Sequence, residues 1–209
     1  KLILGDKGFA RITRKFDAYG NKVEEAFYGC DGKLILGDKG FARITRKFDA
    51  CGNEVEEAFY GCDGKLILGD EGFARITRKF DACRNKVEEA YYGCDGKLII
   101  GDKGFARITR KFDACGNITS ETYYGIGGDL IISIMGYAMV KRKFDKFGNI
   151  KKVTTYGVDG GLIVTYGSNM PKNLQGEFSN DPVIRKALKR FKDKIKCLNR
   201  YKFLENRIS

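Results

Sequence analysis

The chain has 209 residues, a net charge of +12, and a composition that is 43% hydrophobic and 32% charged. These values are typical of a folded protein rather than a disordered one, and no apolar run approaches the roughly 18 residues that span a membrane as a helix. The chain contains no histidine, which excludes Ser-His-Asp and Cys-His catalysis and the common zinc sites.

Residue 1 is Lys and the given residues contain no signal peptide, so we expect the chain to begin inside a longer protein. These residues therefore do not identify the cellular compartment of the protein.

From residue 1 the sequence repeats itself with a period of 32 residues. Five copies occupy 1–32, 33–64, 65–96, 97–128 and 129–160, and a decayed sixth start with a linker follows at 161–179. The first two copies differ only at Tyr19/Cys51 and Lys22/Glu54. A fixed period of this length is typical of repeat architectures, in which stacked units build one continuous core.

Each copy contains three turn signals, which in the second copy are "GDKG", "FDACGN" and "CDGK". Between them lie three extended pieces, at 33–36, 41–49 and 54–61, that are rich in β-branched and aromatic residues. The sequence predicts a mainly β protein, a tandem β-hairpin repeat array that forms either an elongated sheet or a β-solenoid. The hairpins would span 9–29 and its counterparts, with "KLIL" crossing over or forming a separate short row.

The hairpin turn also predicts a register. If Asp49 faces Asn53 across a three-residue loop that closes with a left-handed Gly52, then Arg46 faces Glu56. By the same counting Arg142 would face Lys152, a repulsive pair in the fifth copy.

The stretch "FDACGNEVEEAFYGCDG" at 48–64 resembles the YD-type (RHS-like) tandem β-hairpin repeat, with its aromatic-Asp-x-x-Gly-Asn, Tyr and Asp-Gly pattern. The resemblance covers residues 1–160, with Phe in place of the usual Tyr before Asp and a longer period. It implies a β-hairpin array, and it adds the hypothesis that the chain is a fragment of a larger secreted RHS-like protein.

The cysteines follow the repeat. Cys30, Cys62 and Cys94 stand where later copies have Ile126 and Val158, and Cys51, Cys83 and Cys115 stand where other copies have Tyr19 and Phe147. Exchange with apolar residues favours buried structural thiols, while disulfides and a metal site remain the alternatives. The odd total of seven cysteines favours a reducing compartment.

No set of residues suited to catalysis, metal binding or cofactor binding can be assembled from the repeats. The repeated Glu-Glu pairs, such as Glu24 and Glu25, point to opposite faces of a strand and are expected to pair with Arg and Lys. Arg84 replaces the turn glycine of its sister copies, so we expect about 1 kcal/mol of strain there if the left-handed geometry is kept.

The final segment, 180–209, differs from the repeats. Asn180 or Asp181 followed by Pro182 indicates a helix start, and Ile184, Leu188, Phe191, Ile195 and Leu198 form one apolar stripe. The predicted amphipathic α-helix carries the candidate anion- or partner-binding residues Arg185, Lys186, Lys189, Arg190, Lys192, Lys194, Lys196, Arg200 and Lys202. Three roles are open to this helix. It would cap the last repeat, dock on a partner helix or an anionic membrane, or bind along the phosphate backbone of a nucleic acid.

These features favour a non-enzymatic repeat scaffold whose surface binds a protein partner. The alternative is a binder of polyanions, either nucleic acid or an anionic membrane surface, that acts through the basic helix. Self-association is also expected from an array of nearly identical copies.

Overall fold

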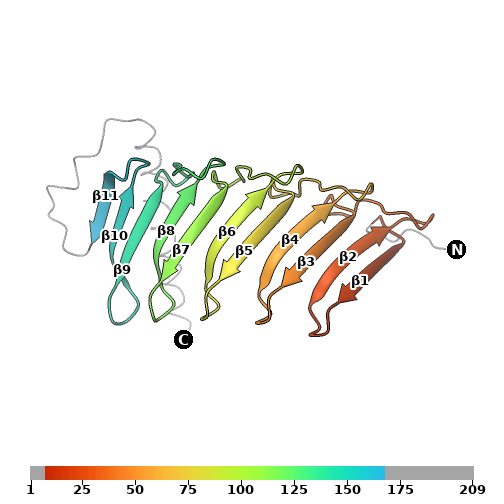
Figure 1. Cartoon of the computed structure of the whole chain (residues 1–209), viewed down its shortest axis with the longest axis horizontal. Coiled ribbons are helices and arrows are strands. Elements are labelled where there is room, and N and C mark those ends of the chain that lie inside the picture. The colour runs from red at the N-terminus through yellow and green to blue at the C-terminus, as the bar shows by residue number, and fades with distance from the viewer. Residues whose placement is uncertain (1–7, 168–209) are drawn as a thin grey trace, which may run out of the picture.

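The computed structural model describes residues 8–167, which form one open antiparallel sheet of eleven strands arranged in sequence order. Figure 1 shows the hairpin loops along one long edge of this array and the connections between copies along the opposite edge. The open sheet confirms the predicted β-hairpin array and decides against a solenoid. The predicted C-terminal helix and its nine basic residues lie outside the described residues.

Each of the five copies contributes one hairpin, and the sixth start contributes a single strand. The strands are β1 Arg11–Phe16, β2 Lys22–Tyr28, β3 Arg43–Phe48, β4 Glu54–Tyr60, β5 Arg75–Phe80, β6 Lys86–Tyr92, β7 Arg107–Phe112, β8 Ile118–Tyr124, β9 Met139–Phe144, β10 Ile150–Tyr156 and β11 Leu162–Gly167. Because each copy adds two antiparallel strands, the chain enters every copy in the same direction. Residues with the same place in the repeat therefore have the same place in the sheet.

The hairpin loop is built by an Asp and an Asn at its base. In the second copy, the Asp49 amide donates to the Asn53 carbonyl at 3.0 Å, and Gly52 donates to the Asp49 carbonyl at 3.0 Å. The Asp49 carboxylate accepts hydrogen bonds from the Asn53 side chain and from two loop amides, at 2.9 Å each. Gly52 has φ +79°, a left-handed conformation that suits glycine, and the predicted loop type is confirmed.

The "KLIL" segment crosses from one hairpin to the next and makes no strand of its own. Leu34 forms a single bridge with Tyr28, and the Ile35 amide donates to the Phe27 carbonyl at 3.0 Å. The chain then turns at Gly37, where a Cβ atom would lie only 3.0 Å from the Phe27 ring. Each connection therefore folds closely over one face of the sheet.

The two faces of the sheet have different roles because successive strand residues alternate between them. We call the face with Phe27, Ile44 and Phe59 the inner face and the face with Arg43, Lys47 and Tyr60 the outer face. The connections cover part of the inner face, where Phe27, Phe41 and Ile44 are buried and Ile35 packs against them. The core therefore lies between the sheet and its own connections.

A continuous row of aromatic rings runs through this core across all five copies. Neighbouring ring centroids lie 5.0–5.9 Å apart and the rings are tilted, a spacing at which aromatic pairs attract beyond their burial. The row consists of Phe9, Phe27, Phe41, Phe59, Phe73, Tyr91, Phe105, Tyr123 and Tyr137. Each copy thus packs on its neighbours, as stacked repeats require.

The register differs from the predicted one by a single residue. Phe48 pairs with Glu54 as the loop requires, but Lys47 then pairs with Glu56, so that Val55 has no partner. Arg46 consequently faces Glu57 and not Glu56, and Arg142 faces Val153 and not Lys152. The cause is a β-bulge at this position in every hairpin, an extra residue that counting from the loop alone does not show.

The prediction of buried thiols is wrong. Cys30, Cys51, Cys62, Cys83, Cys94 and Cys115 are exposed and free. Tyr19 and Phe147, which stand at the same loop position as Cys51, are 86% and 76% exposed. This position lies in a protruding hairpin loop, so an apolar residue there is no sign of burial.

The sixth start ends the described sheet in a different way from the other copies. The "KLIL" segments cross over to the next hairpin, whereas strand β11 pairs antiparallel with β10. Thr165 lies opposite Thr154, and Val164 lies opposite Thr155. In earlier copies the corresponding edge of the hairpin is taken by the first strand of the next copy. Strand β11 therefore takes the place that the first strand of a further repeat would occupy.

Candidate functional site

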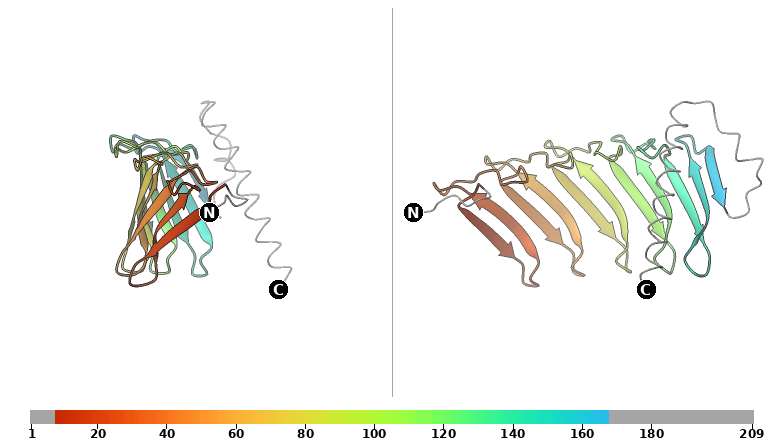
Figure 2. Two further views of the ribbon diagram at one scale, coloured as in Figure 1. Left: turned by 90° about the vertical axis from the view of Figure 1, so that its right-hand side faces the viewer. Right: turned by 180° about the vertical axis from the view of Figure 1, so that it is seen from behind.

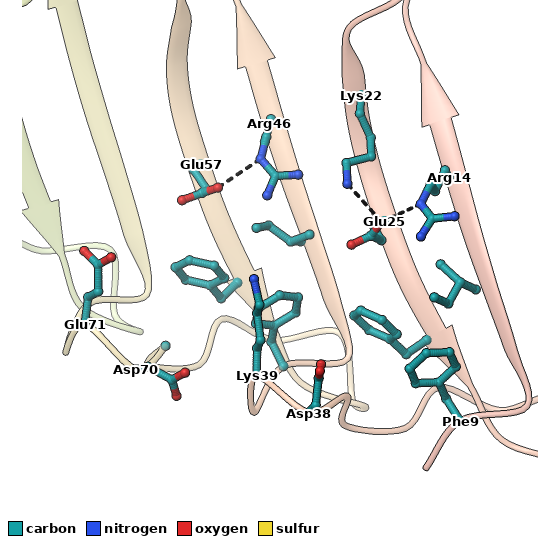
Figure 3. A pocket seen from close by; sticks show the side chains of 16 residues that line it. Phe9, Arg14, Lys22, Glu25, Asp38, Lys39, Arg46, Glu57, Asp70 and Glu71 are labelled. Carbon is teal, nitrogen blue, oxygen red and sulfur yellow. Dashed lines mark hydrogen bonds and ion pairs between the residues drawn. The ribbon is translucent and has the colours of Figure 1, made fainter. Parts of the chain in front are cut away.

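The inner face carries a groove of about 520 Å³ over the first two hairpins, bounded by connection residues of the second and third copies. Its lining comes from strands β1 to β4 and from two connections (Figure 3). The lining residues are Phe9, Ile12, Arg14, Lys22, Glu25, Phe27, Asp38, Lys39, Phe41, Ile44, Arg46, Glu57, Phe59, Gly69, Asp70 and Glu71. At roughly 4.8 Å per strand, four strands give the groove a length of about 14 Å.

The floor of the groove is lined by ion pairs between neighbouring strands. Arg14 Nε lies 2.6 Å from the Glu25 carboxylate, and Lys22 approaches the same carboxylate at 2.9 Å. In the next copy, Arg46 Nε lies 2.9 Å from Glu57. Burial by itself would raise the pKa of Glu25, but hydrogen bonds and attraction from Lys22 and Arg14 outweigh it and hold this pKa below its ordinary value.

The same row of charges continues beyond the groove along the inner face. Arg78 contacts Glu54 of the preceding copy, and Arg142 lies 2.8 Å from Glu121, which also pairs with Arg110 at 3.2 Å. The pairs made by Arg78 and Arg142 join one copy to the next.

The rim of the groove is formed by exposed residues of the connections. Asp38, Lys39, Asp70 and Glu71 are exposed, and among the described residues none of these four makes an ion pair. Three of the four are acidic. The rim is therefore a net negative edge whose charges make no ion pair among the described residues, beside a floor of paired charges.

Between the ion pairs and the rim, the wall of the groove is apolar (Figure 3). Phe27, Phe41 and Ile44 are buried there, while Phe9 and Phe59 remain partly exposed. Figure 3 shows the ion pairs and the aromatic rings side by side along the strands, with the rim residues at the connections. The arrangement can bind a ligand that has both apolar and basic groups.

The outer face carries a different ladder of charges. Lys47 lies 2.8 Å from Glu56, and Arg75 of the next copy lies 3.2 Å from the same carboxylate. The equivalent trios Lys15, Glu24, Arg43 and Lys79, Glu88, Arg107 have the same geometry. Arg43, Arg75 and Arg107 also stack on tyrosine rings at 3.9–4.3 Å from the ring centroids. The ladder ends after the third copy, because Ser120 and Lys152 replace the glutamate.

The sequence predicted that the strand glutamates pair with Arg and Lys, but it gave Arg46 the wrong glutamate and did not predict the groove. All nine candidate residues of the tail lie beyond residue 167. Of the groove residues, the sequence drew attention only to Glu25 and Arg46, as structural charge partners and not as parts of a site. The signal that could have identified the rim is the "GDKG" turn, because a charged turn that folds back over an apolar face must place its charges along that face. Within residues 8–167 no group of three or more Cys, Asp or Glu is suited to hold a metal ion.

In the same range there is no helix long and apolar enough to cross a membrane. The resemblance to the YD-type repeat stays a prediction. No protein-family model matches this chain, and no curated protein matches it.

Proposed function

We propose that this array is a non-enzymatic scaffold that binds an extended segment of a protein partner in the inner-face groove. The observation that carries the proposal is the acidic rim of Asp38, Asp70 and Glu71 above an apolar wall. A segment with basic residues on one side and apolar residues on the other would match both surfaces. The groove length of about 14 Å corresponds to roughly four extended residues.

The charges support a binding role for the groove. The floor carboxylates are already paired, whereas the rim carboxylates make no ion pair among the described residues and are open to a ligand. Charge complementarity at an exposed rim mainly sets specificity and association rate, while the partly exposed rings of Phe9 and Phe59 offer the apolar contact area. Because the groove forms between copies, it depends on the stacking of repeats.

The experiment is a selection of peptides from a displayed random library on the full chain, followed by affinity measurements on the selected peptides. We expect enriched peptides to combine Lys or Arg with aromatic or aliphatic residues. The double variant Asp38→Lys/Asp70→Lys reverses two rim charges at exposed positions, and it should weaken binding by at least about tenfold.

The matched control is Asp102→Lys, which changes the equivalent exposed residue of a later connection outside the groove. It should bind the selected peptides like the parent protein. Peptides that bind the rim variant as well as they bind the parent would contradict a role for the groove, as would a selection that enriches no peptide.

A further inference from the structure

The hairpin of the fifth copy differs sharply in charge from its sister hairpins. Between Met139 and Tyr156 it has six basic residues and one acidic residue, whereas the second copy has three basic and four acidic residues between Arg43 and Tyr60. The six are Lys141, Arg142, Lys143, Lys146, Lys151 and Lys152. The fold is unchanged, so the difference lies on the surface of the hairpin.

The positive charge of this hairpin is not neutralised within the sheet. On the outer face, Lys152 stands where the second copy has Glu56, and it lies directly opposite Lys143. All five lysines of the hairpin are exposed. Among the described residues only Arg142 of this set makes an ion pair, with Glu121. Two like charges that face each other are unfavourable, so an anion at this place would relieve them.

The tip of the same hairpin is apolar. Phe147 is 76% exposed and Ile150 is 56% exposed, and the Lys146 ammonium lies 4.9 Å from the Phe147 ring centroid. In the second copy the same two positions hold Cys51 and Glu54. The fifth copy therefore combines two exposed apolar side chains with a surrounding group of lysines.

The position of the tip makes these side chains accessible to a flat surface. In both views of Figure 2 the hairpin loops project along one edge of the array, and the connections lie along the opposite edge. A loop at this edge can enter an interface without any change in the pairing of β9 and β10.

We propose that the β9–β10 hairpin docks the array on an anionic lipid surface. Phe147 and Ile150 would enter the boundary between headgroups and acyl chains, while the lysines contact lipid phosphates and carboxylates. Exposed aromatic and aliphatic residues flanked by Lys are typical of segments that lie in a membrane interface, and clustered basic residues are attracted to acidic leaflets.

A nucleic acid fits these observations less well. Binding of single strands uses a groove that follows the backbone and aromatic rings that stack with bases. Here the charges surround a protruding loop, and one of its two exposed apolar residues is the aliphatic Ile150, which offers no ring for stacking.

The chain has no Trp, so the variant Phe147→Trp gives the full-length protein a single indole reporter at the tip. It would be mixed with phosphatidylcholine vesicles containing about 30 mol% phosphatidylserine and with vesicles of phosphatidylcholine alone. We expect a blue shift of emission, and quenching by lipids brominated in the acyl chain, only with the acidic vesicles.

Matched variants separate this hairpin from the rest of the chain. Tyr19→Trp places the reporter in the equivalent loop of the first copy, where no shift is expected. In the Phe147→Trp background, Lys143→Glu/Lys151→Glu should weaken vesicle binding by about tenfold or more. Lys33→Glu/Lys65→Glu, at exposed positions of the connections, should leave it unchanged. Circular dichroism would establish that each variant keeps its β-structure.

Three results would overturn the proposal. The first is an indole emission of Phe147→Trp that does not shift with acidic vesicles, and the second is an equal emission shift for Tyr19→Trp. The third is vesicle binding that the Lys143→Glu/Lys151→Glu change does not weaken. If the indole emission of the Phe147→Trp variant responds to single-stranded RNA but not to vesicles, the hairpin is assigned to nucleic acid instead.

Discussion

The guanidinium of Arg84, in the hairpin loop of the third copy, donates a hydrogen bond of 3.2 Å from Nε to the side-chain oxygen of Asn53 in the loop of the second copy. It also donates to the backbone carbonyl of Cys51. Arg84 has φ +65° and is the one non-glycine residue with positive φ within residues 8–167. The strained backbone is thus offset in part by contacts that join two neighbouring loops.

Two substitutions separate the strain at Arg84 from its contacts. Arg84→Ala keeps the left-handed backbone and removes both hydrogen bonds, so we expect it to lower the free energy of unfolding by about 0.5–1 kcal/mol. Arg84→Gly also removes the strain, so it should be about 1 kcal/mol more stable than the Ala variant. Urea unfolding of the two variants measures the difference, and equal stability would contradict strain at this residue.

The β-bulge decides which charges face each other, and a double-mutant cycle can test this register. Arg46 and Glu57 lie 2.9 Å apart with side chains that are 19% and 17% exposed. We expect a coupling energy of about 0.5–1 kcal/mol between Arg46→Ala and Glu57→Ala. The pair Arg46 and Glu56, which a hairpin without the bulge would bring together, should show a coupling near zero. A larger coupling to Glu56 would contradict the register.

Acid should destabilise the array. Burial alone would raise the pKa of Glu89, but hydrogen bonds from Lys86 and Tyr91, with attraction from Lys86 and Arg110, hold it below the ordinary value of 4.5. A carboxyl whose pKa is depressed on folding stabilises the protein above the unfolded pKa, and this stabilisation is lost as the pH falls through the folded pKa. Stability measured by urea unfolding should therefore decrease from about pH 5 downward.

The variant Glu89→Gln checks the contribution of this carboxyl. Its stability should be lower at pH 7 and should depend less on pH below 5, because the titrating group is absent. The matched control Glu71→Gln removes an exposed carboxylate at the groove rim and should follow the parent profile. A Glu89→Gln profile parallel to that of the parent would contradict the assignment.

Strand β11 protects an edge that would otherwise accept another strand. Val164 is 3% exposed and lies opposite Thr155, whereas Leu162 of the same strand is 64% exposed. Val164→Asp buries an unpaired charge and should cost about 3 kcal/mol, enough to detach β11 and leave the edge of β10 free. Light scattering should then show concentration-dependent association. Leu162→Asp is the control, and a Val164→Asp protein that associates no more than the parent protein would contradict a capping role.

Much of the fold was predictable because the turns are encoded locally. The Asp and Asn at the base of each hairpin loop, and the glycine before that Asn in four of the five copies, specify the loop through short-range interactions. A period of 32 residues with such a loop in every copy implies a hairpin array. The groove was less accessible to prediction, since its rim and floor come from copies 32 residues apart.

The sequence by itself determined the repeat and the position of every hairpin loop, because both depend on neighbouring residues. The left-handed backbone at Arg84 was a condition of the strain expected there, and the structure shows it, with φ +65°. The tertiary structure alone decided three other features: the shift of Arg46 from Glu56 to Glu57, the exposure of the cysteines, and the place of β11 at the end of the described sheet. The register and the place of β11 depend on how the strands pair, and one bulged residue is enough to change every later partner in the hairpin. The exposure of the cysteines depends on how far the turns project from the sheet.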